Sequence, residues 1–256
     1  MSEVSRTALG VATMRAIETR RPNRLFEDPY AEAFVPLTPE KIDRANQSLF
    51  RVHIVVRTRF FDDYLLAAVK AGCQQVVLVA AGLDTRAFRL DWPEEIRLYE
   101  LDLPTLLAYK EKTLGGRGAE PRADRTVVPV DLREDWPQNL VTAGFDPSVP
   151  TAWLVEGLLV YLTADEAAGV LAAVTSLSAP GSQIGCEDRD PDAPSERNPP
   201  QRANVMDLWK GGVATVEWLT EHGWQVETYE GTALAESYGR EPEAPVGNFL
   251  TATRPE

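Results

Sequence analysis

The chain has 256 residues, and its 26 Lys and Arg against 39 Asp and Glu leave a formal net charge of −13. An acidic surface of this kind repels phosphate backbones, which argues against a sequence-independent nucleic-acid binder. The longest apolar runs, such as 76–81, are much shorter than the ~20 residues of a membrane helix. The first residues also lack the apolar segment of a secretory signal. Two cysteines far apart and two histidines predict a cytoplasmic protein without a metal site.

The first 72 residues are expected to form a helical cap that belongs to the same domain as the rest of the chain. Apolar residues recur at helical spacing over 7–18, and Pro22 ends this pattern. They recur again over 59–71, where Gly72 supplies a C-terminal stop. Residues 73–256 are expected to form the core of the domain.

The core alternates strands with helices, which predicts a doubly wound α/β sheet. The continuous apolar run at 76–81 is typical of a strand buried on both faces of a parallel sheet. Thr163 and Glu166 form a capping box, which predicts the start of a helix. An excursion rich in Pro, Asp and Arg follows the fifth strand and is interpreted as a lid over about 188–211. Further strands are expected at 96–102, 126–131, 151–156, 182–186, 224–229 and 248–253, the last two forming a hairpin-like end, with helices at 104–114 and 214–222.

The turn after the first strand is the place to look for a ligand, because open α/β sheets bind ligands outside the carboxyl ends of their strands. Gly82 permits a close backbone approach in this turn, although a lone glycine is also typical of an ordinary turn. Asp102 follows Gly82 by 20 positions, which is the spacing of a carboxylate that accepts ribose hydroxyls. The GxGxxG fingerprint is absent, so a pyrophosphate would lack its cradle. The turn therefore favours an adenosine ligand without pyrophosphate, such as S-adenosylmethionine.

The segment AAGLDTRAFRL at 80–90 resembles the signature of the leucine carboxyl methyltransferase family of S-adenosylmethionine-dependent O-methyltransferases. That family includes a large bacterial group and polyketide O-methyltransferases of the tetracenomycin type. The resemblance implies a Rossmann-like class I methyltransferase sheet of about seven strands, with the helical cap and the lid added to it. Further matches follow the same order in the chain, at 28–30, 56–59, 99–104, 130–132 and 156–162.

The resemblance also implies which residues hold the cofactor. Arg57 matches an arginine that binds the methionine carboxylate, and a guanidinium is suited to a carboxylate because it can bind both oxygens. Glu156 matches an acid that faces the methionine end of the cofactor. The remaining matches are Arg15 as a second basic residue, Ala80 and Gly82 along the methionine and ribose, Asp102 on the ribose with Glu100 as its alternative, and Asp131 with the backbone of Leu132 on the adenine.

Two departures from the family pattern matter. The family often has glycine where this chain has Ala80, whose methyl group would crowd the cofactor slightly. The segment 188–211 does not match the substrate segment of the protein phosphatase methyltransferases, so a phosphatase C-terminus is not the expected substrate.

The predicted reaction is methylation of a carboxylate, or alternatively a phenol, on a small-molecule or polyketide-like acceptor by in-line displacement. A carboxylate is already deprotonated at pH 7, whereas a phenol would benefit from a base. His53 and Tyr161 are the nearest candidates, with Tyr161 expected to orient the acceptor oxygen and both also compatible with plain structural roles. A non-catalytic S-adenosylmethionine-binding protein and a nucleotide-dependent oxidoreductase remain as alternatives. A monomer and a homodimer both suit this fold.

Overall fold

The computed structural model describes residues 3–46, 50–188 and 213–255 and shows a seven-stranded sheet with the strand order β3-β2-β1-β4-β5-β7-β6. The first five strands run parallel, and β7 is antiparallel to both of its neighbours. Apart from Asp188, the lid expected at 188–211 lies outside the described residues. The strands are β1 (Gln75–Val79), β2 (Arg97–Asp102), β3 (Asp124–Pro129), β4 (Thr151–Val155), β5 (Gln183–Glu187), β6 (Gln225–Tyr229) and β7 (Phe249–Thr253).

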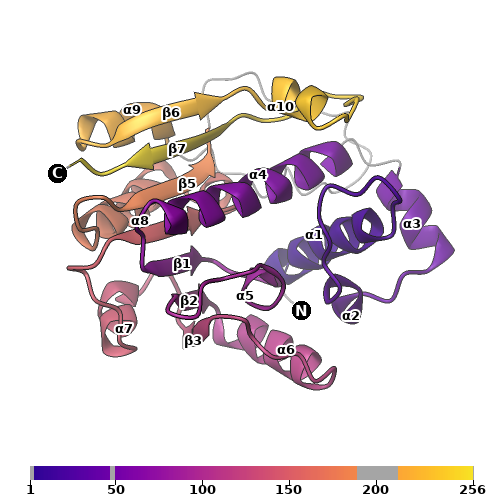
Figure 1. Ribbon diagram of the computed structural model, residues 1–256, viewed down its shortest axis with the longest axis horizontal. Coiled ribbons are helices and arrows are strands. Elements are labelled where there is room, and N and C mark those ends of the chain that lie inside the picture. Colours follow the sequence, from indigo (N-terminus) through magenta and orange to yellow (C-terminus); the bar gives the residue numbers. More distant parts are fainter. Residues whose placement is uncertain (1–2, 47–49, 189–212, 256) are drawn as a thin grey trace.

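Helices cover both faces of this sheet (Figure 1). One apolar core joins α4, α5, α6 and α10 to one face, and a second core joins α7, α8 and α9 to the other. The described helices are α1 (Glu3–Thr19), α2 (Ala31–Phe34), α3 (Pro39–Asn46), α4 (Phe50–Lys70), α5 (Arg86–Arg89), α6 (Pro104–Gly115), α7 (Trp136–Thr142), α8 (Ala164–Ser176), α9 (Thr215–Glu221) and α10 (Gly231–Ser237), with a 3-10 turn η1 (Leu159–Tyr161).

Helix α4 is part of the layer that covers the sheet. The hydroxyl of Tyr64 donates to the carbonyl oxygen of Trp153 in β4 at 3.0 Å. Its ring packs so closely on Gly185 in β5 that a Cβ at that position would lie 2.7 Å from Tyr64 Cε1. Glycine at this point of β5 therefore lets α4 approach the centre of the sheet, which fixes where the residues at the start of α4 lie.

The doubly wound α/β fold is confirmed, and all seven expected strands are present within a few residues of their expected bounds. The capping box of Thr163 and Glu166 is also confirmed at the start of α8. The hairpin-like end is more elaborate than expected, because β7 lies between β5 and β6 and the connection contains helix α10. Over the described ranges, no helix is long and apolar enough to cross a membrane.

Candidate functional site

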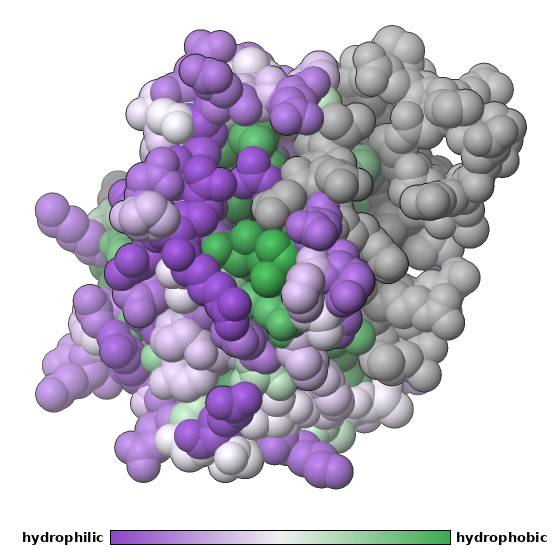
Figure 2. All heavy atoms as spheres, turned by 90° about the vertical axis from the view of Figure 1, so that its right-hand side faces the viewer, coloured by the Kyte–Doolittle hydropathy of each residue, from purple (hydrophilic) through white to green (hydrophobic). Residues whose placement is uncertain are grey.

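The carboxyl ends of the parallel strands define one edge of the sheet, toward which the arrows of β1 and β5 point on the right of Figure 1. Figure 2 faces this side of the molecule and shows an apolar patch in the middle of a largely hydrophilic surface. Ligand sites combine apolar walls with a few polar groups, so this edge has the expected character. The predicted cofactor residues Gly82, Asp102 and Glu156 all follow or end strands here.

The turn after β1 is held by the carboxylate at the end of β2. Asp102 Oδ2 accepts the N–H of Gly82 at 2.7 Å, and Oδ1 accepts the N–H of Leu103 at 2.6 Å. Burial raises the pKa of Asp102, and these two N–H donors partly offset that effect. A carboxylate oxygen can accept more than one hydrogen bond, so each of these oxygens keeps acceptor capacity. Asp102 therefore supports the turn and could still accept hydroxyl groups of a ligand.

The turn itself requires left-handed backbone at two positions. Gly82 has φ +52°, which glycine adopts without cost. Ala80 has φ +59° and is, among the described residues, the one non-glycine residue with positive φ. Left-handed conformation costs an L-residue roughly 1–2 kcal/mol. The departure from the glycine common in the family thus places a strained alanine in the turn after β1.

The third strand brings the proposed adenine residues next to this turn. The N–H of Val130 donates to the carbonyl oxygen of Asp102 at 2.9 Å, which joins the ends of β2 and β3. Asp131 follows at once and is paired with Arg133, whose Nε lies 2.9 Å from Oδ1. Hydrogen bonds from Arg133 lower the pKa of Asp131 to about 2. Leu132 is partly buried beside it.

Glu100 does not lie at this edge, which corrects its expectation as an alternative ribose ligand. Its side chain is fully buried, and its Oε2 accepts from Lys110 Nζ and from Arg125 Nη2, each at 2.7 Å. Glu100 sits two residues before the end of β2, so its carboxylate is enclosed by helix α6 and strand β3. The residue is a structural ion-pair partner, and Asp102 is the acid at the edge.

The ends of β4 and β5 carry a cluster of three charged side chains. Arg57, on α4, contacts Glu156 Oε1 through Nε at 2.9 Å and Glu187 Oε1 through Nη1 at 2.8 Å. Burial lowers the pKa of Arg57, but the charges of both glutamates outweigh burial and raise it. Burial raises the pKa of Glu187, and Arg57 only partly offsets this effect. Burial acts in the same direction on Glu156, but the charges of Arg86 and Arg57 outweigh it and lower the pKa of Glu156. No described residue is hydrogen-bonded to Nη2 of Arg57, which could therefore bind a carboxylate.

Gly157 and Glu187 belong to this cluster and were not expected from the sequence. The N–H of Gly157 donates to both oxygens of Glu187, at 2.9 and 3.0 Å. Gly157 has φ +67°, and a Cβ there would lie 3.2 Å from Arg57 Nη1. The Glu-Gly sequence after β4 is thus explained, since the glutamate pairs with Arg57 and the glycine leaves space for its guanidinium.

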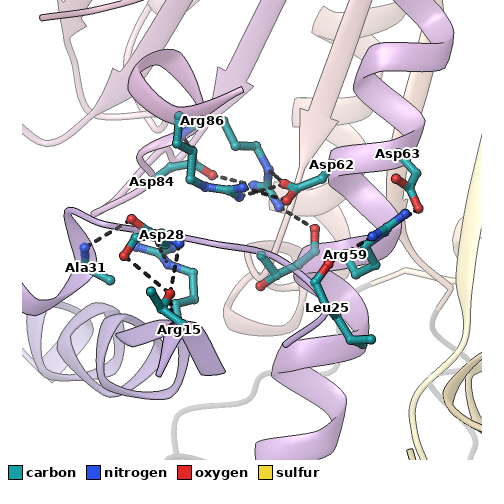
Figure 3. Close-up of polar contacts among 12 residues, drawn as sticks. Arg15, Leu25, Asp28, Ala31, Arg59, Asp62, Asp63, Asp84 and Arg86 are labelled. Atoms are coloured by element: carbon teal, nitrogen blue, oxygen red, sulfur yellow. Dashed lines mark hydrogen bonds and ion pairs between the residues drawn. The ribbon is translucent and has the colours of Figure 1, made fainter. Parts of the chain in front are cut away.

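Behind this cluster, Arg86 links the turn after β1 to α4 (Figure 3). Its Nη1 pairs with Asp84 and lies 2.7 Å from Glu156 Oε2, while its Nε contacts Asp62 Oδ1 at 2.7 Å. Burial raises the pKa of Asp84, but Arg86 and then Arg15 outweigh it and lower the value to about 2. The Asp-Thr-Arg part of the signature therefore acts as a buried ionic clamp.

Arg15 lies behind the turn as well. Its Nη2 donates to the carbonyl oxygen of Leu83 at 2.5 Å, and its Nε lies 2.9 Å from Asp28 Oδ2. Asp28 in turn accepts the N–H of Ala31, as Figure 3 shows. Arg15 therefore anchors α1 to the turn, and any contact with the cofactor would come in addition to these bonds.

His53 and Tyr161 occupy different positions around the edge. His53 Nδ1 accepts the N–H of Gly247 at 3.3 Å, and its ring stacks on Phe249 at 5.7 Å between centroids. Burial and the neighbouring Arg57 lower the pKa of His53 to about 3, so its ring is neutral at pH 7. Tyr161 ends the turn η1 that follows Gly157, and it is partly exposed.

These side chains suit S-adenosylmethionine. A carboxylate with spare acceptor capacity faces the turn, a glycine without a side chain forms the turn, and a guanidinium with an open nitrogen lies at the other end of the edge. None of these features requires a phosphate group on the ligand. A doubly wound sheet with ligand-competent groups at this edge is typical of α/β proteins that bind nucleoside-containing ligands.

Comparison with known proteins makes the class specific. The leucine carboxyl methyltransferase family matches residues 8–175. A protein of Parafrankia sp. (strain EAN1pec) is 47% identical over 98% of this chain and 87% of its own length. A protein of Mycobacteroides abscessus is 38% identical over 100% of this chain and 94% of its own length. Both carry the name of an S-adenosyl-L-methionine-dependent methyltransferase.

A solved structure has a fold similar to that of this chain. A methyltransferase from Thermobifida fusca overlaps 95% of this chain and 94% of its own, with a TM-score of 0.56 at 16% identity. The chain belongs to the leucine carboxyl methyltransferase family. It is a methyltransferase that uses S-adenosylmethionine, so the oxidoreductase and the non-catalytic binding protein are set aside.

Proposed function

We propose that the enzyme transfers a methyl group to a carboxylate oxygen of a small-molecule acceptor, with a phenol as the competing acceptor. A polyketide-like or related natural product in the cytoplasm is the proposed setting, and the acidic chain is proposed to act on no nucleic acid. The enzyme is proposed to act as a monomer or as a homodimer. The observation that supports a carboxylate is the state of the titratable groups around Arg57.

Among the described titratable groups around Arg57, each candidate base is already engaged in a hydrogen bond or an ion pair. His53 accepts a backbone hydrogen bond, and its pKa of about 3 makes it a weak base. Both oxygens of Glu187 accept the N–H of Gly157, and the two oxygens of Glu156 pair with Arg57 and Arg86. A carboxylic acid ionises near pH 4 and needs no base, whereas a phenol ionises near pH 10.

The chain's own part in the reaction is then binding, orientation and exclusion of water. Bound S-adenosylmethionine supplies a methyl group on a positively charged sulfur. Asp102 is proposed to bind the ribose, Asp131 and the backbone of Leu132 the adenine, and Nη2 of Arg57 the methionine carboxylate. Orientation of the acceptor oxygen in line with the methyl group supplies much of the rate enhancement in such displacements. Tyr161 is proposed to orient that oxygen by donating a hydrogen bond.

The test uses acceptor pairs that share one carbon skeleton and differ only in carrying a carboxylic acid or a phenol. The purified enzyme is incubated with methyl-labelled S-adenosylmethionine, and methyl esters and methyl ethers are quantified separately. We expect esters, formed at a rate that changes little between pH 6 and 8.5, because the acid is ionised throughout. Ether formation alone, with a rate rising about tenfold per pH unit, would contradict the proposal.

A further inference from the structure

A cavity outside the cofactor turn lies between three helical segments. It is lined by Arg21 after α1, by Arg51 and Val52 at the start of α4, and by the end of α10 with the residues that follow it. Its volume is about 530 Å³, which is within the range of small-molecule sites. The segment after α10 contributes Gly239 and Arg240 and, with α10 itself, the exposed acids Glu236 and Glu241.

Two of the three cavity arginines already share one buried acid. Glu18 is 1% exposed, and its Oε1 accepts from Arg240 Nη2 at 2.5 Å. Arg21 Nε lies 3.6 Å from Glu18 Oε2. Arg240 Nη2 also donates to the carbonyl oxygen of Asn23 at 2.6 Å, which fixes its direction. The carboxylate of Glu18 is therefore already paired with Arg240 and Arg21 in the wall of the cavity.

The third arginine, Arg51, differs from these two. No carboxylate of a described residue forms an ion pair with it, although Glu18 and Glu243 lie near enough to act on its charge. Burial first, and repulsion from Arg21 next, lower the pKa of Arg51. A guanidinium that is partly desolvated beside other guanidinium groups is stabilised by a bound anion. Within the described part of the chain, Arg51 thus lines the cavity without an ion-pair partner, although the exposed Glu236 and Glu241 line the same cavity.

Helix α4 carries both the cavity arginine and the arginine at the sheet edge. Arg51 lies six residues before Arg57 on α4, which is about 9 Å along a helix axis. Val52 adds an apolar wall beside it. Six residues also correspond to about 600° of helix rotation, so the two side chains leave α4 in directions roughly 120° apart.

We propose that this cavity is a binding site for the carboxylate of a small organic acid, held by Arg51 with Arg21 beside it. The inference rests on the proposed function only for the source of that carboxylate. The carboxylate belongs either to the methyl acceptor, as its second acidic group, or to a separate small acid that binds next to the acceptor. The methylated oxygen itself lies at the Arg57 edge and not in this cavity.

The binding test uses phthalate and succinate as probes, with chloride at equal ionic strength as the reference, in calorimetric titrations of the full chain. We expect saturable binding to the wild type that weakens about tenfold or more in Arg51→Gln and only partly in Arg51→Lys. Arg24→Gln, an exposed arginine paired with Glu27, is the matched control and should change nothing. Glu241→Gln should leave binding equal or stronger, because it removes a rim carboxylate.

Two further measurements distinguish the two possible sources of the bound carboxylate. If the carboxylate belongs to the acceptor, acids that bind the cavity are methylated, and Arg51→Gln raises their KM while kcat stays nearly unchanged. If it belongs to a separate acid, the probes change the KM of another acceptor and are not methylated themselves. Absence of saturable binding by either probe, or equal binding by wild type and Arg51→Gln, would overturn the proposal. Absence of S-adenosylhomocysteine binding to the wild type would instead refute the cofactor site, independently of Arg51.

Discussion

The two halves of the sheet edge are built by different means. At β1, β2 and β3, backbone N–H groups converge on one carboxylate, Asp102, and the strand ends are joined by main-chain hydrogen bonds. At β4 and β5, the side chain of Arg57 forms ion pairs with both Glu156 and Glu187. The first half is a preformed shape in which main-chain N–H groups are fixed by one carboxylate. The second half is held by ion pairs between side chains, and a charged ligand can alter these pairs.

This difference predicts that the largest single effect on cofactor binding lies in the backbone-built half. Asp102→Ala removes the acceptor of two N–H groups and the proposed ribose ligand. Charge-assisted hydrogen bonds contribute about 1.5–3 kcal/mol each, so we expect the Kd for S-adenosylhomocysteine to rise about 100-fold in calorimetric titration. An unchanged Kd would remove Asp102 from the site.

Glu100→Gln is the matched control for that variant. It changes an acid two residues away on the same strand, but one that is enclosed with Lys110 and Arg125. Loss of one charge from a buried pair is expected to destabilise the fold by about 3 kcal/mol. The Kd of the folded variant for S-adenosylhomocysteine should remain within about threefold of the wild type.

The ionic clamp predicts a dependence of stability on acid pH. The folded-state pKa of Asp84 is about 2, below its ordinary value of 3.8. A lowered pKa contributes stability that is present above about pH 4 and is lost as the pH falls toward 2. This amounts to roughly 2 kcal/mol, since one pKa unit corresponds to about 1.4 kcal/mol. In urea unfolding, the stability gap between wild type and Asp84→Asn should therefore shrink between pH 5 and pH 2.5.

Asp91→Asn serves as the control, because Asp91 is exposed and pairs with Arg122 at the surface. Its effect should be small at both pH values. A gap for Asp84→Asn that is constant over this pH range would show that the clamp does not hold Asp84 ionised.

Gly157→Ala tests whether the charge-built half needs its close packing. The added Cβ would lie 3.2 Å from Arg57 Nη1 at a residue with φ +67°. We expect a loss of about 1–2 kcal/mol in the free energy of unfolding and weaker cofactor binding, because the guanidinium must shift. Gly169→Ala in α8, where nothing lies within 4 Å, should instead stabilise the chain slightly. Equal effects of both substitutions would contradict the packing argument.

Ala80→Gly has the smallest expected effect. It relieves left-handed strain of roughly 1–2 kcal/mol, but glycine also increases the entropy of the unfolded chain by about 0.4–1 kcal/mol. A net gain of up to about 1 kcal/mol should raise Tm by about 2–4 °C at most. A lower Tm would mean that the methyl group of Ala80 makes contacts worth more than the strain.

The sequence predicts the strands well because each is a run of apolar or alternating residues, and β1 and β4 are buried throughout. Helix α10 escapes prediction because it is short and lies in a glycine-containing connection between two strands. The placement of β7 between β5 and β6 depends on pairing across the sheet, which no local pattern encodes.

The site residues, like the strands and helices, are predicted from the sequence only in part. Strand periodicity puts Glu100 and Asp102 on one face of β2, so sequence alone leaves both as candidates. Burial by Lys110 and Arg125 distinguishes them, and these partners come from the next helix and the next strand. Glu187 is missed because it ends a strand just before the segment interpreted as a lid. The usable signal was its place at the end of β5, beside the end of β4.

The preformed half of the site is tested most directly by a crystal structure of the enzyme with S-adenosylhomocysteine. We predict an Asp102 carboxylate oxygen within hydrogen-bond distance of the ribose hydroxyls, with the N–H of Gly82 still bound to that carboxylate. We also predict the homocysteine carboxylate on Nη2 of Arg57. Ribose bound by any other side chain, or a turn at 80–82 that rearranges around the ligand, would contradict the claim that this half of the site is preformed.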